Sequence, residues 1–176
     1  MKPPPRRAKA KKIVDIDLQE AIDVDQAQAC HVPNADTFHA WISACIAAEN
    51  LSCAVVTVRL VDVPEMTDLN HTYRHKTGPT NVLSFPCDLP QEISQDFLGD
   101  IIICAPVVAR EAAEQNKNPA AHWCHMVVHG ILHLLGYDHE DDAQAQTMEQ
   151  KEREILAGLG FDDPYREESL SQAAIS

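Results

Sequence analysis

Apolar and polar positions follow two periods along the chain, and the shorter period predicts strands. Segments rich in β-branched residues, or alternating between apolar and polar residues, are typical of strands that pack one face on a core. Such segments occupy residues 13–17, 53–63, 82–85 and 98–104. Because these strands are short and helical segments separate them, the predicted fold class is α+β, with a small mixed β-sheet flanked by helices.

The longer period and the boundary residues predict the helices. Asp36 is placed to cap a helix over residues 37–49, whose apolar residues fall on one stripe. Proline suits the first turn of a helix. The prolines predicted to open helices are Pro64, Pro106 and Pro119, and these helices are expected to reach residues 73, 116 and 135. Gly136 is placed to end the third of them, and a charged helix is expected over residues 141–159.

Length and charge divide the chain into three parts. Residues 1–12 hold six Lys or Arg, no acidic residue and three consecutive prolines, which predicts a disordered basic arm. A single domain is expected over residues 13–163, followed by a C-terminal tail over residues 164–176. Outside the arm the chain has eight basic and 27 acidic residues, a net charge of −19. An acidic body repels polyanions, so any nucleic acid must be bound locally.

Cysteine usage and hydropathy predict a cytoplasmic protein. The six cysteines are scattered, and none forms a C-x-x-C pair, so free buried thiols are expected rather than disulfides. No apolar run approaches the roughly 20 residues of a membrane span. The first residues also lack the apolar stretch of a secretory signal. A membrane partner is therefore not expected.

Histidines cluster on the third predicted helix and just beyond it. His125, His129 and His133 are spaced four residues apart, so they form one stripe on a helix. Two neighbours on this stripe can share an ion, but the outer pair lie about 12 Å apart along the axis. A reversal at Gly136 would bring His139 back to the same place. The sequence therefore predicts a metal site made of His129, His133 and His139.

This set of ligands is typical of a catalytic metal. Three neutral nitrogen ligands with an open fourth position describe a catalytic zinc site rather than a closed structural one. One Zn²⁺ per chain is expected, with another divalent transition metal as the alternative. Such an ion lowers the pKa of bound water toward about 7 and polarises an attacked carbonyl or phosphoryl group. His122 and His125 are expected to line the cleft or bond locally, with His125 a weaker acid–base candidate.

One position argues against a peptidase. Zinc peptidases of the H-E-x-x-H type carry a glutamate directly after the first ligand, where it acts as the general base. Gly130 occupies that position here.

Three blocks of sequence resemble one known family. The string HGILHLLGYDH at residues 129–139 resembles the signature of the YbeY family of bacterial rRNA-maturation proteins. LNHTYRHKTGPTNVLSFP at residues 69–86 and LGDII at residues 98–102 are similar to two further family blocks, in the same order and spacing. The resemblance covers about residues 53–160. It implies a zincin-like metallohydrolase architecture and a metal-dependent, single-strand-specific endoribonuclease, which acts on the 3′ end of 16S rRNA and in ribosome quality control.

The resemblance also implies roles for individual residues. The three metal ligands map onto the same histidines, and a functional arginine maps onto Arg74, which is predicted to bind a phosphate and offset charge in the transition state. Asp138, from its position just before the third ligand, is predicted to orient a histidine or accept a proton, or alternatively to cap the following helix. Thr80, Ser84 and Asp100 are expected to build the cleft or to satisfy backbone groups, and Thr80 and Ser84 are also predicted substrate-binding residues. Asn81 stands where the family usually has Asp, which removes one carboxylate near the site.

RNA as the substrate rests on the resemblance alone. The chain shows no RRM, KH or OB signature, and aromatic residues make up only 5% of it. The expected partners are single-stranded RNA or rRNA and the ribosomal small subunit or its assembly proteins. Two alternatives stay open: a metal-dependent hydrolase of amides or esters, and a ribosome-assembly binding factor whose metal is mainly structural.

Overall fold

The computed structural model describes residues 13–90 and 96–166. The predicted basic arm, residues 1–12, and the part of the predicted tail beyond residue 166 lie outside the described residues. The elements, in chain order, are β1 (Ile13–Glu20), α1 (Val24–Ala29), α2 (Ala35–Ala48), β2 (Cys53–Val61), α3 (Val63–Arg74), β3 (Val82–Pro86), β4 (Phe97–Cys104), α4 (Ala105–Glu114), α5 (Pro119–Leu134) and α6 (Asp142–Gly158).

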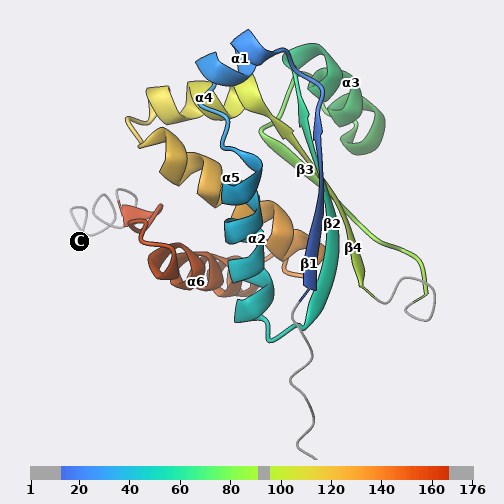
Figure 1. The fold of residues 1–176 in the computed structure, drawn as a ribbon, viewed down its shortest axis with the longest axis vertical. Helices are drawn as coiled ribbons and strands as arrows, with labels where there is room; N and C mark the ends of the chain where they lie inside the picture. The colour runs from blue at the N-terminus through green and yellow to red at the C-terminus, as the bar shows by residue number, and fades with distance from the viewer. Residues whose placement is uncertain (1–12, 91–95, 167–176) are drawn as a thin grey trace, which may run out of the picture.

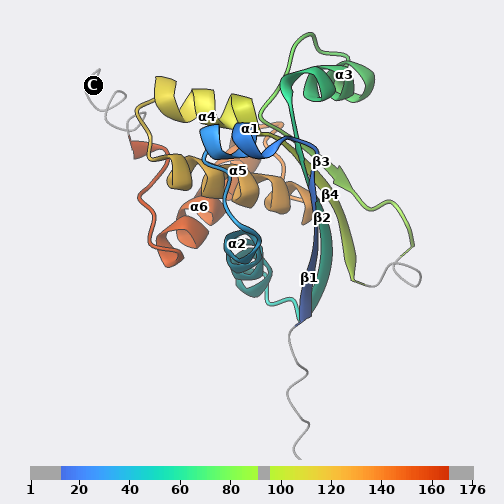
Figure 2. The same cartoon turned by 45° about the horizontal axis from the view of Figure 1, so that its top comes forward.

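The strands form one mixed sheet in the order β1-β2-β4-β3. β1 pairs parallel with β2, and β2 pairs parallel with β4. β3 is antiparallel to β4 and forms one edge of the sheet. Figures 1 and 2 show α2, α4, α5 and α6 on one side of the sheet and α3 on the other. The predicted α+β class with a small mixed sheet flanked by helices is confirmed.

The main core lies between the sheet and the helical layer. Along β2, buried side chains alternate with half-buried ones, so Ala54, Val56 and Val58 face the helices. α5 is the central helix, because it packs against α2, α4, α6, β3 and β4. Its Trp123 is fully buried, and the indole Nε1 donates a hydrogen bond to the Cys30 carbonyl oxygen at 3.0 Å. Burial of so many apolar side chains is the main stabilising contribution to the fold.

A smaller cluster beneath α3 holds the segment that leads into β3. Its buried members are Val61, Met66, Leu83, Cys104 and Val107. The buried Asn70 donates from Nδ2 to the Gly78 carbonyl oxygen at 2.8 Å. This bond fixes the loop between α3 and β3 relative to the helix, because a buried amide is costly unless it is paired. Asn70 thus sets where the edge strand begins.

The structure corrects several predicted boundaries. Asn34, not Asp36, caps α2, and its Oδ1 accepts from the Thr37 backbone N–H at 2.9 Å. β2 ends at Val61 because the next residue, Asp62, caps α3. The Asp62 side chain accepts a hydrogen bond from the Glu65 backbone N–H. β1 is longer than predicted, and α1 was not predicted because it contributes no buried residue and so carries no apolar stripe.

Other predictions of local structure are confirmed. Pro64, Pro106 and Pro119 each lie in the first turn of a helix. All six cysteines are free, and four of them are buried. Within the described part of the chain, no helix has the length and hydropathy needed to cross a membrane.

Gly99 provides a test of the sheet geometry. Its φ is +134°, and a Cβ at this position would lie 2.2 Å from the Phe85 carbonyl oxygen. We expect Gly99→Ala to lower the free energy of unfolding by more than about 2 kcal/mol, through backbone strain and the clash with β3. Gly158→Ala is the control, because nothing lies within 4 Å of a Cβ there. Urea unfolding of both variants measures the difference, and equal stability would contradict this close approach.

Candidate metal centre

α5 and the loop after it bring three histidines together. The candidate ligand atoms of His129, His133 and His139 all lie within 4.8 Å of one another. Gly136, with a φ of +93°, reverses the chain, and its N–H donates to the His133 carbonyl oxygen at 3.1 Å. Tyr137 holds the reversed loop by donating from its hydroxyl to Glu49 at 3.0 Å. The structure therefore brings together the three residues that the sequence predicted as ligands.

The geometry of the two helical histidines fits a metal ion. Their Nε2 atoms are 3.2 Å apart. In a tetrahedral site with Zn–N bonds of about 2.0–2.1 Å, ligand nitrogens are separated by about 3.3–3.4 Å. Burial and the neighbouring charges of His129 and His139 lower the pKa of His133, outweighing the opposite effect of Asp138. A lowered pKa keeps the imidazole neutral at neutral pH, which is the form that binds metals.

Glu152 fixes the orientation of His129 through the ring nitrogen that does not face the site. It is fully buried on α6, and its Oε1 accepts a hydrogen bond from His129 Nδ1 at 2.7 Å. Protonation of Nδ1 leaves the lone pair of Nε2 free to face the site. Burial raises the pKa of Glu152, but hydrogen bonds from His125 and His129 more than offset this and hold the pKa at about 2. The carboxylate therefore stays ionised at neutral pH.

His125 belongs to the support of the site rather than to the ligand set. Its Nε2 lies 3.3 Å from the second oxygen of Glu152 and 3.2 Å from the Tyr165 hydroxyl. The Tyr165 hydroxyl also donates to Glu152. These contacts agree with the expectation that His125 bonds locally, and they place it behind the ligands.

Glu152 was not predicted from the sequence, although its pattern carries a signal for such a residue. The buried residues of α6 are Met148, Glu152, Ile155 and Leu156, which recur at helical spacing. A single carboxylate on an otherwise apolar stripe requires a buried partner. Its distance of 23 residues from His129 hid the identity of that partner.

A cleft of about 490 Å³ opens beside the histidines. Residues that line it include Arg74, Ser84, Pro86, His133, Asp138 and His139. Arg74 is exposed at the end of α3 and forms no salt bridge with any residue that the structure describes. Its guanidinium is therefore available to an anion in the cleft.

The other predicted site residues take different positions. Ser84 lines the cleft, and its hydroxyl donates to the Gly130 carbonyl oxygen at 3.1 Å. Thr80 is not among the residues that line the cleft, and Asp100 lines a separate groove. Asp138 accepts from the His139 backbone N–H at 2.8 Å. The alternative role of Asp138 as a helix cap is wrong, because Asp141 caps α6.

Asn81 points away from the cleft and toward α4. Its Nδ2 lies 3.2 Å from both carboxylate oxygens of Glu111, whose Oε2 also contacts His122 Nε2 at 2.9 Å. Burial raises the pKa of Glu111, but bonds from His122 and Asn81 lower it below its ordinary value of 4.5. The amide therefore pairs with a half-buried carboxylate, and its presence removes no group from the cleft.

Gly130 faces the sheet, which explains why no glutamate stands there. A Cβ at this position would lie 3.2 Å from Ile101 Cγ2 and 3.3 Å from Val82 Cγ2. A longer side chain would be driven into β3 and β4 rather than into the cleft. The general base of H-E-x-x-H peptidases thus has no room at this point of the fold.

The fold and the site together define a class. A mixed sheet with an antiparallel edge strand, bordered by a helix that carries two of the three histidines able to hold a metal, is a zincin-like metallohydrolase architecture. A family model described as Endoribonuclease YbeY matches residues 21–160. The chain belongs to the YbeY family.

Two relatives, from Methylococcus capsulatus and Halorhodospira halophila, agree with this assignment by sequence. The chain is 51% identical over 155 residues to the Endoribonuclease YbeY of Methylococcus capsulatus, covering 88% of this chain and 97% of the relative. It is 55% identical over 138 residues to that of Halorhodospira halophila, covering 77% and 89%. The solution structure of TM1509 from Thermotoga maritima is 24% identical, with a TM-score of 0.48 over 83% of this chain and 91% of that one.

Glu152→Gln tests the support of the metal centre. The amide keeps the shape of the side chain but loses the charge that holds the His129 tautomer, so we expect metal affinity to fall about 10–100-fold. Competition with a coloured chelator measures this affinity. Glu154→Gln, on the exposed side of the same helix, is the matched control. Unchanged affinity in Glu152→Gln, with the fold intact by circular dichroism, would contradict the assigned role.

Asn81→Asp tests the pairing with Glu111. A second carboxylate 3.2 Å away should lower the free energy of unfolding by about 1–2 kcal/mol at pH 7. Repulsion raises the pKa of the pair in the folded state above its unfolded value, so the loss should shrink as the pH falls through that raised pKa toward the unfolded value of about 4–4.5. In the parent protein the lowered pKa of Glu111 gives the opposite trend, with stability lost as the pH falls below about 4.5. The double variant Asn81→Asp/Glu111→Gln should recover the loss at pH 7, and a failure to do so would contradict the pairing.

Proposed function

We propose that this protein is a metal-dependent endoribonuclease that cleaves single-stranded RNA during rRNA maturation, with Zn²⁺ held by His129, His133 and His139. The observation that carries the proposal is the convergence of three histidine nitrogens beside a cleft that His133 and His139 line together with Arg74, which forms no salt bridge with any described residue. Membership of the YbeY family supports RNA as the substrate. Processing of the 3′ end of 16S rRNA and ribosome quality control are the proposed settings.

The residues of the cleft divide the chemistry between them. Zinc, when bound, supplies a Lewis acid that activates water and polarises a phosphoryl group. Arg74 binds the phosphate through its forked guanidinium and offsets negative charge as the phosphodiester is attacked. Asp138, exposed in the cleft beside His139, accepts a proton from the attacking water. Glu152 keeps His129 oriented throughout.

Phosphate binding has to be local in this protein. The chain outside residues 1–12 has a net charge of −19, so most of its surface repels RNA. Arg74 provides positive charge at the one place where the chemistry requires it. Ser84 contributes hydroxyl lone pairs to the cleft wall, since its proton is given to Gly130. Thr80 stays a predicted substrate-binding residue from the resemblance alone.

The structure favours this proposal over the two alternatives. An amide hydrolase of the usual zinc-peptidase type would need its base at Gly130, where the sheet leaves no room. A mainly structural metal would be enclosed by four protein ligands, whereas His139 is exposed and the cleft is open. The proposed partners are rRNA and the ribosomal small subunit or its assembly proteins, in the cytoplasm.

The proposal is tested by metal content and cleavage of single-stranded RNA measured on the same preparations. The parent protein should bind about one zinc ion per chain and cleave. His133→Ala should lose both properties, because two ligands do not hold the ion. Arg74→Ala should keep the metal and lose activity by a factor of about 10²–10³, as expected for a group that stabilises the transition state.

Arg110→Ala is the matched control for the arginine, because Arg110 is an exposed residue of α4 with only a 3.8 Å ion pair to Glu114. It should cleave at the parent rate. A parent protein that binds metal but cleaves RNA no faster than His133→Ala would overturn the proposed activity. Equal rates for Arg74→Ala and Arg110→Ala would overturn the role of Arg74 alone.

A further inference from the structure

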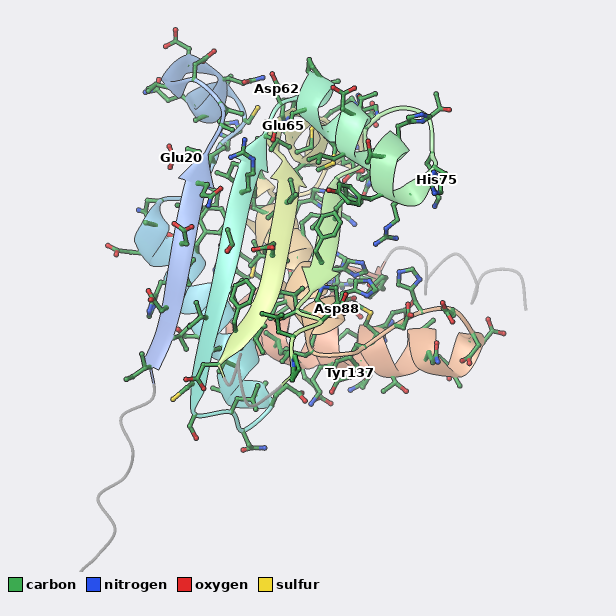
Figure 3. The ribbon with its side chains drawn as sticks, turned by 90° about the vertical axis from the view of Figure 1, so that its right-hand side faces the viewer. Glu20, Asp62, Glu65, His75, Asp88 and Tyr137 are labelled. Carbon is green, nitrogen blue, oxygen red and sulfur yellow. The ribbon has the colours of Figure 1, made fainter. Side chains whose placement is uncertain are left out.

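The sheet face opposite the helical layer carries a groove that the chemistry described so far does not use. Figure 3 looks onto this face, where α3, between the labelled Glu65 and His75, is the helix on the viewer's side. The groove has a volume of about 480 Å³, within the range of small-ligand sites. Residues that line it include Gln19, Thr57, Arg59, Tyr73, Phe85 and Asp100.

An aromatic pair forms the wall of the groove nearest the metal centre. Tyr73 of α3 meets Phe85 of β3 edge to face, with ring centroids 5.0 Å apart. Tyr73 is 58% exposed and is the only aromatic among the exposed large hydrophobic residues of the described chain. An open aromatic ring beside a groove is the feature with which proteins stack nucleobases.

Among the described residues, the floor of the groove offers a carboxylate but no cation free of an ion pair. The strand register places Asp100 directly between Thr57 and Phe85 on three adjacent strands. Arg59 is committed to Glu65 at 2.8 Å and to Gln19 at 3.3 Å. A phosphate is therefore disfavoured here. A neutral base that donates an amino group to Asp100 is favoured, because carboxylates accept from exocyclic amino groups.

The groove and the metal cleft meet at the edge of the sheet. Tyr73 lines the groove, and the next residue, Arg74, lines the cleft. Phe85 likewise lines the groove, while its neighbours Ser84 and Pro86 line the cleft. A single RNA strand that crosses this edge can therefore place a phosphate beside Arg74 and an adjoining base against Tyr73.

We propose that this base groove binds one unpaired, amino-bearing nucleobase of the RNA, stacked on Tyr73 and hydrogen-bonded to Asp100. The inference rests on the proposed ribonuclease function and adds to it a residue-level basis for selecting single strands. In an A-form duplex each base is stacked between its neighbours, and the deep, narrow major groove keeps its amino group out of reach of side chains. Only an unpaired base can therefore stack on Tyr73 and reach Asp100.

The test is direct binding of fluorescent oligocytidine and oligouridine RNA of equal length, followed by anisotropy. Oligocytidine should bind the parent protein more tightly, because uracil lacks an amino group. Tyr73→Leu, which keeps an apolar contact with Phe85, should weaken oligocytidine binding about tenfold. Tyr73→Phe should bind like the parent, since it retains the ring. Asp100→Asn should remove the preference between the two oligonucleotides.

The matched control is Val24→Ala, which alters an exposed apolar residue outside the groove and should bind like the parent. Equal oligocytidine affinity for Tyr73→Leu and the parent would overturn the base groove, whether or not the protein cleaves RNA. Equal binding of both oligonucleotides by the parent would overturn the assignment of Asp100. If the parent protein does not cleave RNA, while Tyr73→Leu still weakens oligocytidine binding, the result would count against the proposed function alone.

Discussion

Helix α5 has to satisfy two requirements, and the arrangement of the site follows from them. It is the centre of the core, packed against the sheet and three helices, so most of its surface must be apolar. It also carries two metal-ligand candidates, whose imidazoles need polar partners once they leave water. Gly130 reconciles the two, because its lack of a side chain lets the helix approach β3 and β4 closely. His129 and His133 are thereby held next to the edge strand that forms the opposite wall of the cleft.

Two carboxylates, one fully buried and one half-buried, complete this arrangement on either side of α5. Glu152 comes from α6 and pairs with His125 and His129, while Glu111 comes from α4 and pairs with His122 and Asn81. Each carboxylate has its pKa lowered by these bonds despite burial. The histidines on the polar side of α5 are thus hydrogen-bonded to carboxylates from neighbouring helices. This pairing is required because a buried ionised group is stabilised only when it is fully paired. This pairing links the packing of the helical layer to the orientation of the ligands.

The edge strand β3 separates two chemically different surfaces. Successive side chains point to opposite faces of a strand, so Ser84 faces the metal cleft while Phe85 faces the outer groove. The cleft has an arginine without a salt bridge to any described residue and suits a phosphate, whereas the groove has an aromatic wall and a carboxylate and suits a base. Outside residues 1–12 the net charge is −19, so among the described residues this division places attraction for a polyanion beside Arg74.

The sequence by itself determined the class of fold and predicted which three histidines come together, because both depend on local spacing. Helical periodicity placed His129 and His133 on one face, and a glycine at residue 136 allowed the return of His139. Strand periodicity and the prolines likewise located most elements, whereas α1 left no apolar stripe to detect. Tertiary structure alone decided the partners of those residues: Glu152 for His129 and Glu111 for Asn81. These pairs join separate elements, and their contact depends on how the helices pack rather than on any period along the chain.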